Sequence, residues 1–256
     1  MSALLSVASL TKSFGGLRAV RTVSFDVTAE SITALIGPNG AGKTTVFNLV
    51  SGFLRPDGGR VHFAGANVTG RAPREMAKLG LVRTFQRVQL FADMTVLDNV
   101  LTGAHLHTRG GLPAALFRPP ATRAERARVE TAARRLLERV GLGARASDPA
   151  GTLAFGQQRL LEIARALAAR PRLLLLDEPA AGLNPAETQR LGALIESVRN
   201  EGLSVLFIEH DMNLVMTIAG RVVVLDFGEK IAEGAPDDIQ RHPRVLEAYL
   251  GVEEPA

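Results

Sequence analysis

Residues Gly37 to Thr45 have the types and spacing that phosphate binding needs: Gly-Pro-Asn-Gly-Ala-Gly-Lys-Thr-Thr. The loop follows an apolar run at 32–36, a predicted strand, and precedes a predicted helix from 46. Glycines let backbone N–H groups turn inward and let phosphate oxygens approach without meeting a Cβ. The helix start adds unpaired N–H groups and a positive dipole end. The pattern predicts a nucleotide phosphate loop, and its flanks disfavour the alternative of a glycine-rich turn that binds nothing.

Two side chains of this loop have separate expected tasks. The ammonium of Lys43 can lie between β- and γ-phosphates, and the hydroxyl of Thr44 can ligate Mg²⁺. We assign nucleotide binding to the whole loop, which comprises Gly37, Pro38, Asn39, Gly40, Ala41, Gly42, Lys43, Thr44 and Thr45.

A second group of residues that could take part in a reaction is the carboxylate pair Asp177 and Glu178, which directly follows the apolar run 173–176. Carboxylates at the end of a buried strand are costly without a nearby cation, and Mg²⁺ on a nucleotide would supply one. Asp177 would then complete the surroundings of the metal, while Glu178 positions or deprotonates a water. The alternative is a strand that ends at an exposed polar turn.

Three further side chains are candidates on their position alone. Gln86 follows a predicted strand at 81–85, where open α/β sheets bind ligands. His210 follows a predicted strand at 204–208, although a histidine there is more often structural than catalytic. Phe14 precedes a glycine turn, and its ring can either stack on a nucleotide base or pack ordinarily.

The elements that must position these residues alternate between strands and helices. Strands are predicted at 4–7, 19–27, 32–36, 60–63, 81–85, 173–176, 204–208, 222–225 and 230–232, and helices at 46–50, 73–78, 95–106, 121–140, 157–167, 186–200 and 244–250. Arginines and glutamates alternate along 121–140, which favours a solvated face over a docking surface. We expect an α/β core with a helical insertion at 88–163.

Composition limits the classes of protein that remain. With 256 residues, 46% of them hydrophobic, the chain can bury a sizeable core, and the absence of cysteine excludes disulfides and thiolate metal sites. No secretory signal or long apolar run is visible, so we expect a cytoplasmic protein. The net charge is only +4 and 26 acidic residues are interspersed with 30 basic ones, which favours a mixed surface over a nucleic-acid-binding one.

Together the motifs resemble, over nearly the whole chain, the nucleotide-binding subunits of ABC transporters. The matching segments occur in the order of the family: 37–45 resembles the Walker A loop, Gln86 the glutamine loop, 153–158 the signature motif, 173–178 Walker B with the catalytic glutamate, 181–184 the D-loop, and His210 the switch histidine. Phe14 falls where the family has its adenine-stacking aromatic.

A finer resemblance is to the ATPases of branched-chain amino acid importers, although related importers of urea, amides or other small polar solutes look similar. The matching strings are Phe14–Leu17, Val82–Gln86, Leu153–Gln158, Asp177–Pro185, Ile208–Met212 and Glu247–Gly251.

The chain departs from the general family pattern at three positions. Ala154 replaces a serine that bonds the γ-phosphate, Phe155 replaces a glycine, and Asn184 replaces the D-loop aspartate. Loss of a hydroxyl bonded to a charged group costs about 1.5–3 kcal/mol. Because the Gly156 amide and its helix start remain available to a phosphate, we expect a weaker or slower ATP complex that still works.

The resemblance implies an α/β fold: a P-loop NTPase (RecA-like) core with an N-terminal antiparallel β subdomain, from 1–87 and 164–235, an inserted helical subdomain at 88–163, and a C-terminal extension at 236–256. It also implies an ATPase that uses ATP and Mg²⁺ and works as a head-to-tail dimer with an identical or a different ATPase subunit. Signature residues Ala154, Gly156 and Gln157 would complete the nucleotide site of the partner copy. Catalysis is implied for Glu178, His210 and Lys43, and metal binding for Thr44, Gln86 and Asp177.

The same resemblance implies membrane partners and a location. Permease subunits would couple through the region of Gln86 and 88–150, with a periplasmic solute-binding protein acting indirectly and no nucleic acid involved. The chain would lie on the inner face of the cell membrane. The alternatives are the motor of a lipid or lipopolysaccharide exporter, and a soluble ABC ATPase of translation or DNA repair. The latter usually has two cassettes or coiled-coil insertions, which this chain lacks.

Overall fold

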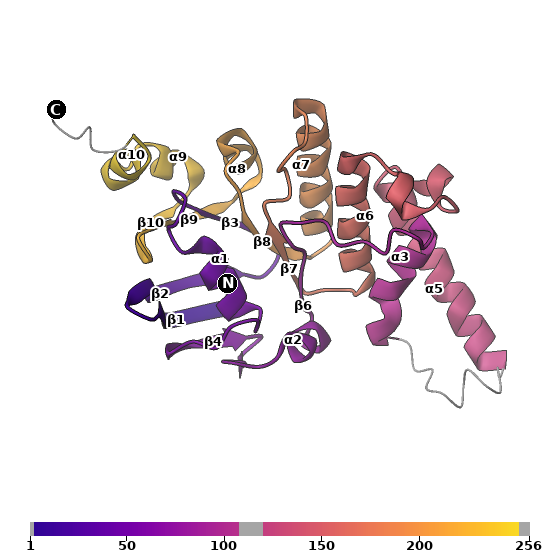
Figure 1. Ribbon diagram of the computed structural model, residues 1–256, viewed down its shortest axis with the longest axis horizontal. Coiled ribbons are helices and arrows are strands. Elements are labelled where there is room, and N and C mark those ends of the chain that lie inside the picture. The colour runs from indigo at the N-terminus through magenta and orange to yellow at the C-terminus, as the bar shows by residue number, and fades with distance from the viewer. Residues whose placement is uncertain (1–2, 108–119, 251–256) are drawn as a thin grey trace. The chain divides into compact units, whose positions relative to one another are not determined.

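The computed structural model describes residues 3–107 and 120–250, and the chain divides into two compact units. The first unit combines residues 1–83 with 172–256, and the second comprises 84–171 (Figure 1). Residues 251–256, the end of the expected C-terminal extension, lie outside the described part. They include Gly251, the last residue of the string Glu247–Gly251 that resembles the importer ATPases.

An antiparallel sheet of the first unit is built from the N-terminal segment, as expected. Its strands, in the spatial order β2-β1-β4-β5, are β2 (Leu17–Thr28), β1 (Ala3–Phe14), β4 (Gly58–Phe63) and β5 (Ala66–Asn67). Val23, Phe25 and Val27 alternate with less buried neighbours, which places one face of β2 in the core.

A second, mostly parallel sheet is the centre of the first unit. Its spatial order is β10 (Glu229–Gly234), β9 (Arg221–Asp226), β3 (Ile32–Ile36), β8 (Ser204–Ile208), β7 (Leu173–Asp177) and β6 (Leu81–Arg83), with β10 antiparallel to β9. Every residue of β3, β7 and β8 is buried, as is typical of central parallel strands. Because these strands are parallel neighbours, their carboxyl ends meet at one edge of the sheet.

The strand predicted at 81–85 is two residues shorter than expected. β6 ends at Arg83, whose side chain forms an ion pair with Asp177. The next carbonyl groups, of Phe85 and Gln86, accept hydrogen bonds from Arg159 in the second unit rather than extending the ladder.

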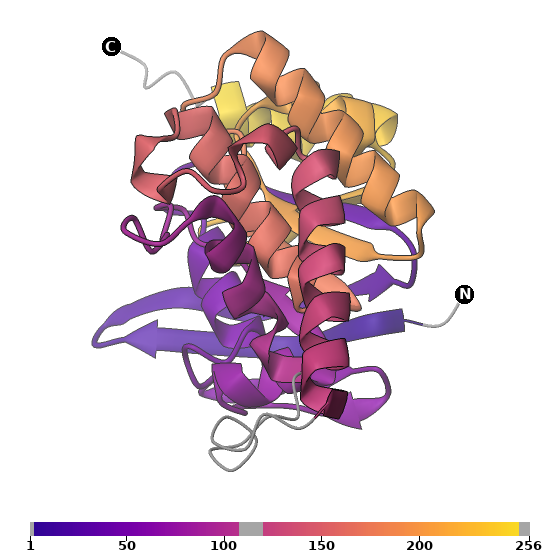
Figure 2. The same ribbon diagram turned by 90° about the vertical axis from the view of Figure 1, so that its right-hand side faces the viewer.

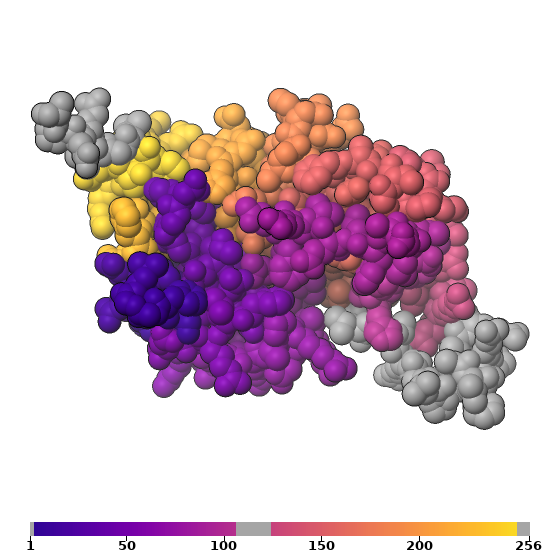
Figure 3. Space-filling view, viewed as in Figure 1, coloured from indigo at the N-terminus to yellow at the C-terminus, as the bar shows by residue number. Residues whose placement is uncertain are grey.

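Six helices belong to the first unit in the part of the chain that the structure describes. They are α1 (Lys43–Val50), α2 (Pro73–Leu79), α7 (Pro185–Asn200), α8 (Met212–Ile218), α9 (Pro236–Gln240) and α10 (Pro243–Leu250). Side chains cap two of them, α7 and α8. The short helices α8 and α9 were not expected, although Asp211 caps α8 by accepting the N–H groups of Asn213 and Leu214. Indigo N-terminal and yellow C-terminal surfaces adjoin in Figure 3, consistent with contacts between β2 and β10.

The second unit is helical, as expected. Its main helices are α3 (Val96–Gly103), α5 (Pro120–Arg139) and α6 (Phe155–Ala168), with 3₁₀ turns at Ala104–His107, Gly143–Arg145 and Ala150–Thr152. Figure 2 shows these helices side by side, and α6 contacts both α3 and α5. Gly103 allows the close approach, since a Cβ there would lie 2.0 Å from the Arg165 carbonyl oxygen.

The boundaries of this unit differ from the expected 88–163. Position 163 falls inside α6, which belongs to the second unit in full. The unit also begins earlier, at Thr84, because Arg159 bonds the carbonyls of Phe85 and Gln86. Along residues 3–107 and 120–250, no helix has both the length and the apolar character to cross a membrane.

Candidate functional site

The glycine loop lies between β3 and α1, as the pattern predicts. Gly37 and Gly42 both have positive φ values, of 149° and 95°. A Cβ on Gly37 would lie 2.0 Å from the Leu225 carbonyl oxygen, and one on Gly42 would lie 2.5 Å from that of Ala19. The loop therefore packs so closely against β9 and β2 that only glycine fits at these two positions.

Helix α1 begins inside the loop, with Gly42 as its N-cap. Gly42 has no side chain that could cap this helix end. Thr44 and Thr45, in that first turn, line the adjoining pocket. A helix start of this kind favours an anion through its N–H groups and its dipole.

Lys43 folds back over the loop. Its ammonium donates to the carbonyl oxygens of Gly37, at 2.7 Å, and Pro38, at 2.8 Å. An ammonium has three donors, so one remains for a further acceptor. Burial lowers the pKa of Lys43 below its ordinary value, and the negative charges of Glu178 and Asp177 partly offset this. Two carboxylates thus help to keep this buried lysine charged.

Asp177 ends β7 in an ion pair that the sequence analysis did not anticipate. Its Oδ2 accepts a hydrogen bond of 2.8 Å from Nη2 of Arg83, and the two side chains are 4% and 5% exposed. Arg83 also donates from Nη1 to Asn48 Oδ1 and Ser51 Oγ, both on the α1 side. The strand end that carries Asp177 is therefore tied to the helix that follows the phosphate loop.

Glu178 and His210 come together at the carboxyl ends of β7 and β8. His210 Nε2 lies 3.2 Å from Glu178 Oε1, within hydrogen-bond distance. Glu178 has a φ of 48°, which is unusual for a residue with a side chain, and its N–H donates to the Ile208 carbonyl. Neighbouring strand β8 thus fixes the backbone that aims this carboxylate.

Glu209 is a positioning residue of the site that the sequence analysis did not single out. It is 3% exposed, and its carboxylate accepts the N–H groups of Ala180, His210 and Asp211. Burial raises the pKa of Glu209, and these three hydrogen bonds oppose that shift. Glu209 therefore joins the loop after Glu178 to the loop that carries His210. The sequence feature that could have identified Glu209 is its position directly after a buried strand.

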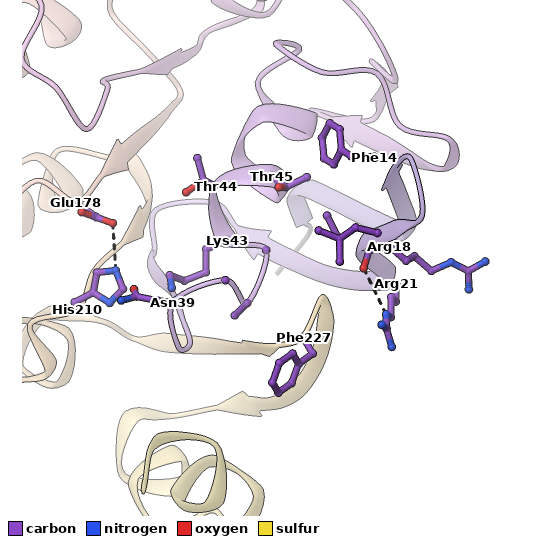
Figure 4. Close-up of a pocket in the computed structure, with 15 residues that line it drawn as sticks. Phe14, Arg18, Arg21, Asn39, Lys43, Thr44, Thr45, Glu178, His210 and Phe227 are labelled. Carbon is purple, nitrogen blue, oxygen red and sulfur yellow. Dashed lines mark hydrogen bonds and ion pairs between the residues drawn. The ribbon is translucent and has the colours of Figure 1, made fainter. Parts of the chain in front are cut away.

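One pocket of about 390 Å³ brings many of these residues together (Figure 4). Its lining comprises Phe14, Leu17, Arg18, Ala19, Arg21, Asn39, Gly40, Ala41, Gly42, Lys43, Thr44, Thr45, Glu178, His210 and Phe227. The phosphate loop, the carboxylate and the histidine thus face one space, as their positions after parallel strands predict. Gly37, Pro38 and Asp177 are not part of this lining. Gly37 and Pro38 are linked to it because their carbonyl groups accept hydrogen bonds from Lys43.

Exposed aromatic rings reach this pocket from two hairpins. Phe14 lies at the end of β1, and Phe227, which the sequence analysis did not identify, lies in the turn between β9 and β10. The Lys12 ammonium lies 5.7 Å from the centre of the Phe14 ring. Arg18 and Arg21 add positive charge between the two rings (Figure 4). Flat rings and cations are suited to a nucleotide base and its phosphates.

Signature residues lie in the second unit, at the start of α6. Ala154 is the N-cap and has no side chain to donate or accept, while Gly156 is buried in the first turn. The Oε1 atom of Gln157 accepts the Ala154 N–H and a hydrogen bond from Arg145, both at 3.2 Å. The Gln157 side chain is thus bonded to the start of the helix, whose backbone amides have the chemistry to bind an anion.

Gln86 is exposed, in an irregular segment that precedes α3. We call residues 85–89 the glutamine loop. It belongs to the second unit, so Gln86 and the signature residues form one group and the pocket residues another.

The oxygen donors of the first unit are compatible with Mg²⁺. No group of three or more histidine, cysteine or acidic side chains that could by itself hold a metal ion occurs among residues 3–105 and 124–249, whose side chains the structure describes. Mg²⁺ bound to a nucleotide needs only one or two protein oxygens, because phosphates and water supply the rest. The exposed hydroxyl of Thr44 and the carboxylate of Asp177 are hard oxygen donors of this kind.

Comparison with protein families and known proteins agrees with this geometry. The ABC transporter family matches residues 20–181, and a family described as branched-chain amino acid ATP-binding cassette transporter matches residues 229–255. The chain is 50% identical to the high-affinity branched-chain amino acid transport ATP-binding protein BraF of Pseudomonas aeruginosa, covering 97% of this chain and 98% of that one. It is 46% identical to LivG of Escherichia coli, with the same coverage.

Solved structures give the same result at the level of the fold. An ATP-binding cassette of an ABC transporter in its ADP conformation aligns with a TM-score of 0.85 at 32% identity, over 98% of this chain and 100% of that one. A nucleotide-free cassette aligns equally well, with a TM-score of 0.85.

Proposed function

Because this chain belongs to the ABC transporter family, we propose that it is the ATP-hydrolysing subunit of an importer of branched-chain amino acids. The observation that carries the proposal is the pocket that brings Lys43, Thr44, Glu178 and His210 together beside a glycine loop. The solute class is supported by the relatives BraF and LivG and by the match at residues 229–255. That match also favours this reading over a lipid exporter or a motor of translation or DNA repair.

Nucleotide binding is assigned to the loop and to Phe14. Lys43 and the amides of residues 37–45 bind the phosphates, and the Phe14 ring stacks on the base. Phe227 offers a second ring for the same task. Mg²⁺ would be held by Thr44 and Asp177, with Gln86 as a third candidate, and when bound it offsets negative charge on the phosphates.

Hydrolysis is assigned to Glu178 and His210. Glu178 accepts a proton from a water whose oxygen forms a bond to the γ-phosphorus, while the bond from that phosphorus to the β–γ bridging oxygen breaks and ADP leaves. His210, within 3.2 Å of Glu178, orients the carboxylate and, with Lys43, stabilises charge on the γ-phosphoryl group.

The signature residues act on a second subunit. We infer a head-to-tail dimer, with an identical or a different ATPase subunit, in which Gly156 and the helix start at Ala154 and Gln157 cap the nucleotide of the partner. Dimer closure drives permease subunits that receive solute from a periplasmic binding protein. The subunit therefore works at the inner face of the cell membrane.

Replacing Glu178 by glutamine tests the catalytic assignment. We expect ATP turnover to fall by about 10²–10⁴-fold, because a general base contributes that much, while ATP binding is kept. Turnover is measured by phosphate release from the purified protein, with the exposed Glu201→Gln as the matched control. Undiminished turnover in Glu178→Gln would remove Glu178 from the base role.

The transport assignment has its own test. Membrane vesicles that contain the chain with its co-purifying permeases and binding protein should take up leucine, isoleucine or valine when ATP is supplied. Uptake of another solute class, with no uptake of these three, would overturn it.

A further inference from the structure

Two oppositely charged side chains lie fully buried in the middle of the helix that begins with the signature residues. Arg159 and Glu162 of α6 are each 1% exposed, and Arg159 Nη1 lies 3.3 Å from Glu162 Oε2. A buried ion pair is costly to desolvate and is weak evidence for stability. These two buried side chains also bind groups other than each other.

The guanidinium of Arg159 binds the backbone of the glutamine loop. Nη1 donates to the Phe85 carbonyl at 2.9 Å, and Nη2 donates to the Gln86 carbonyl at 2.7 Å. The planar fork of an arginine can span two successive carbonyls, whereas the point charge of a lysine cannot. The Phe155 ring, whose centre is 5.8 Å from Arg159 Cζ, lies over this group. The aromatic residue that replaces a family glycine thus contributes to holding the fork.

Glu162 binds the other end of the same loop. Its Oε1 accepts the N–H of Gln89 at 3.5 Å, and Arg165 Nη2 approaches that oxygen at 3.9 Å. Burial raises the pKa of Glu162, and the two arginines oppose the shift. The pair therefore holds the backbone before and after the exposed side chain of Gln86.

We propose that Arg159 and Glu162 are a positioning pair that fixes the glutamine loop to α6, so that Gln86 and Gly156 move as one piece. All of these contacts lie within the second unit. The consequence for catalysis rests on the proposed function, in which Gln86 serves the nucleotide of its own subunit and Gly156 that of the partner. The physical fastening of the loop does not depend on that assignment.

Hydrogen exchange of the intact chain tests the fastening itself. Arg159→Lys keeps the positive charge beside Glu162 but loses the fork. We expect amides of residues 84–91 to exchange at least about tenfold faster, because a hydrogen bond to a charged group is lost. Arg165→Lys is the matched control: the same substitution, on the same helix and beside the same carboxylate. Equal exchange in the two variants would overturn the proposal.

A double-mutant comparison tests whether Arg159 acts through Gln86. ATP turnover and its Mg²⁺ dependence are measured for Arg159→Lys, Gln86→Ala and the double variant. If Arg159 acts by positioning Gln86, the double variant is no slower than Gln86→Ala, whereas independent effects would multiply and contradict the proposal.

These readouts separate the two proposals. A wild-type chain without ATPase activity would overturn the proposed function. Hydrogen exchange at residues 84–91 would still test whether Arg159 and Glu162 fix the glutamine loop. Should Arg159→Lys unfold, the Arg159→Met/Glu162→Leu variant removes both charges with similar volume. Faster exchange at 84–91 in that folded variant supports the proposal, and unchanged exchange contradicts it.

Discussion

Each unit of this protein contains a buried arginine paired with a carboxylate, but the two arginines differ in what else they bind. In the first unit Arg83 joins Asp177 to two side chains of the α1 region, so it ties a strand end to a helix. In the second, Arg159 joins Glu162 to two backbone carbonyls of a loop. The first arginine pairs with the buried carboxylate that ends β7, while the second binds two carbonyl groups of a segment without regular structure.

Both guanidinium groups also lie close to aromatic rings. Arg83 Cζ lies 5.5 Å and 5.7 Å from the centres of the Phe47 and Phe53 rings. Arg159 has the Phe155 ring. The two arginines are thus buried in similar surroundings but bind different partners. We therefore expect the effect of replacing each arginine to depend on the groups that it binds rather than on how deeply it is buried.

The largest effect is expected from Arg83→Met. The change leaves Asp177 buried without its cation, and loss of one partner of a buried pair costs about 3–5 kcal/mol. The free energy of unfolding, measured in urea, should fall by that amount, and ATP turnover should fall with it. Arg21→Met, which breaks an exposed pair with Glu229, is the control and should cost no more than about 1 kcal/mol. A small effect for Arg83→Met would show that Asp177 does not need this partner.

Arg159→Met is expected to cost less, roughly 1.5–3 kcal/mol, because Glu162 keeps Arg165 and the Gln89 N–H as partners. Arg159→Met/Glu162→Leu should recover much of that loss, since no buried charge remains. Urea unfolding of the three proteins gives the comparison. A double variant less stable than Arg159→Met would mean that Glu162 stabilises the unit without its arginine.

A smaller, pH-dependent effect is expected from Glu162→Gln. Because burial raises the pKa of Glu162 above its unfolded value of 4.5, the folded protein binds that proton more tightly. This contribution to stability is present below the unfolded pKa and is lost as the pH rises through the folded one. The free energy of unfolding of the wild type, relative to Glu162→Gln, should therefore fall as the pH increases from 4. A difference that rises with pH would mean that the arginines dominate over burial.

The smallest effect is expected from Arg134→Ala. This arginine pairs with Glu130 on the solvated face of α5, and both side chains are more than 40% exposed. Exposed pairs of this kind contribute about 0–1 kcal/mol, and salt weakens them further. The free energy of unfolding should change little in urea. A loss as large as that for Arg159→Met would indicate that this face of α5 is not merely solvated.

Local patterns explain how much of the site could be predicted. The phosphate loop is a contiguous motif, and the meeting of Glu178 with His210 follows from parallel strands whose carboxyl ends share an edge. Arg83, Arg159 and Glu209 could not be found in this way. Each has a distant partner, respectively Asp177, Phe85 and Ala180, and these partners lie 29 to 94 positions away in the chain. Arg159 and Glu162 also resemble surface residues of an amphipathic helix, since sequence does not reveal that a loop covers them.

The left-handed backbone of Glu178 has a consequence for how the site assembles. A non-glycine residue in that region costs about 1–3 kcal/mol, so the isolated segment would relax to another conformation. Its N–H bond to Ile208 is what secures the turn, and that bond exists only once β8 lies against β7. The direction of the Glu178 carboxylate therefore depends on the pairing of β7 with β8, whereas Lys43 is held inside its own loop by the carbonyl groups of Gly37 and Pro38.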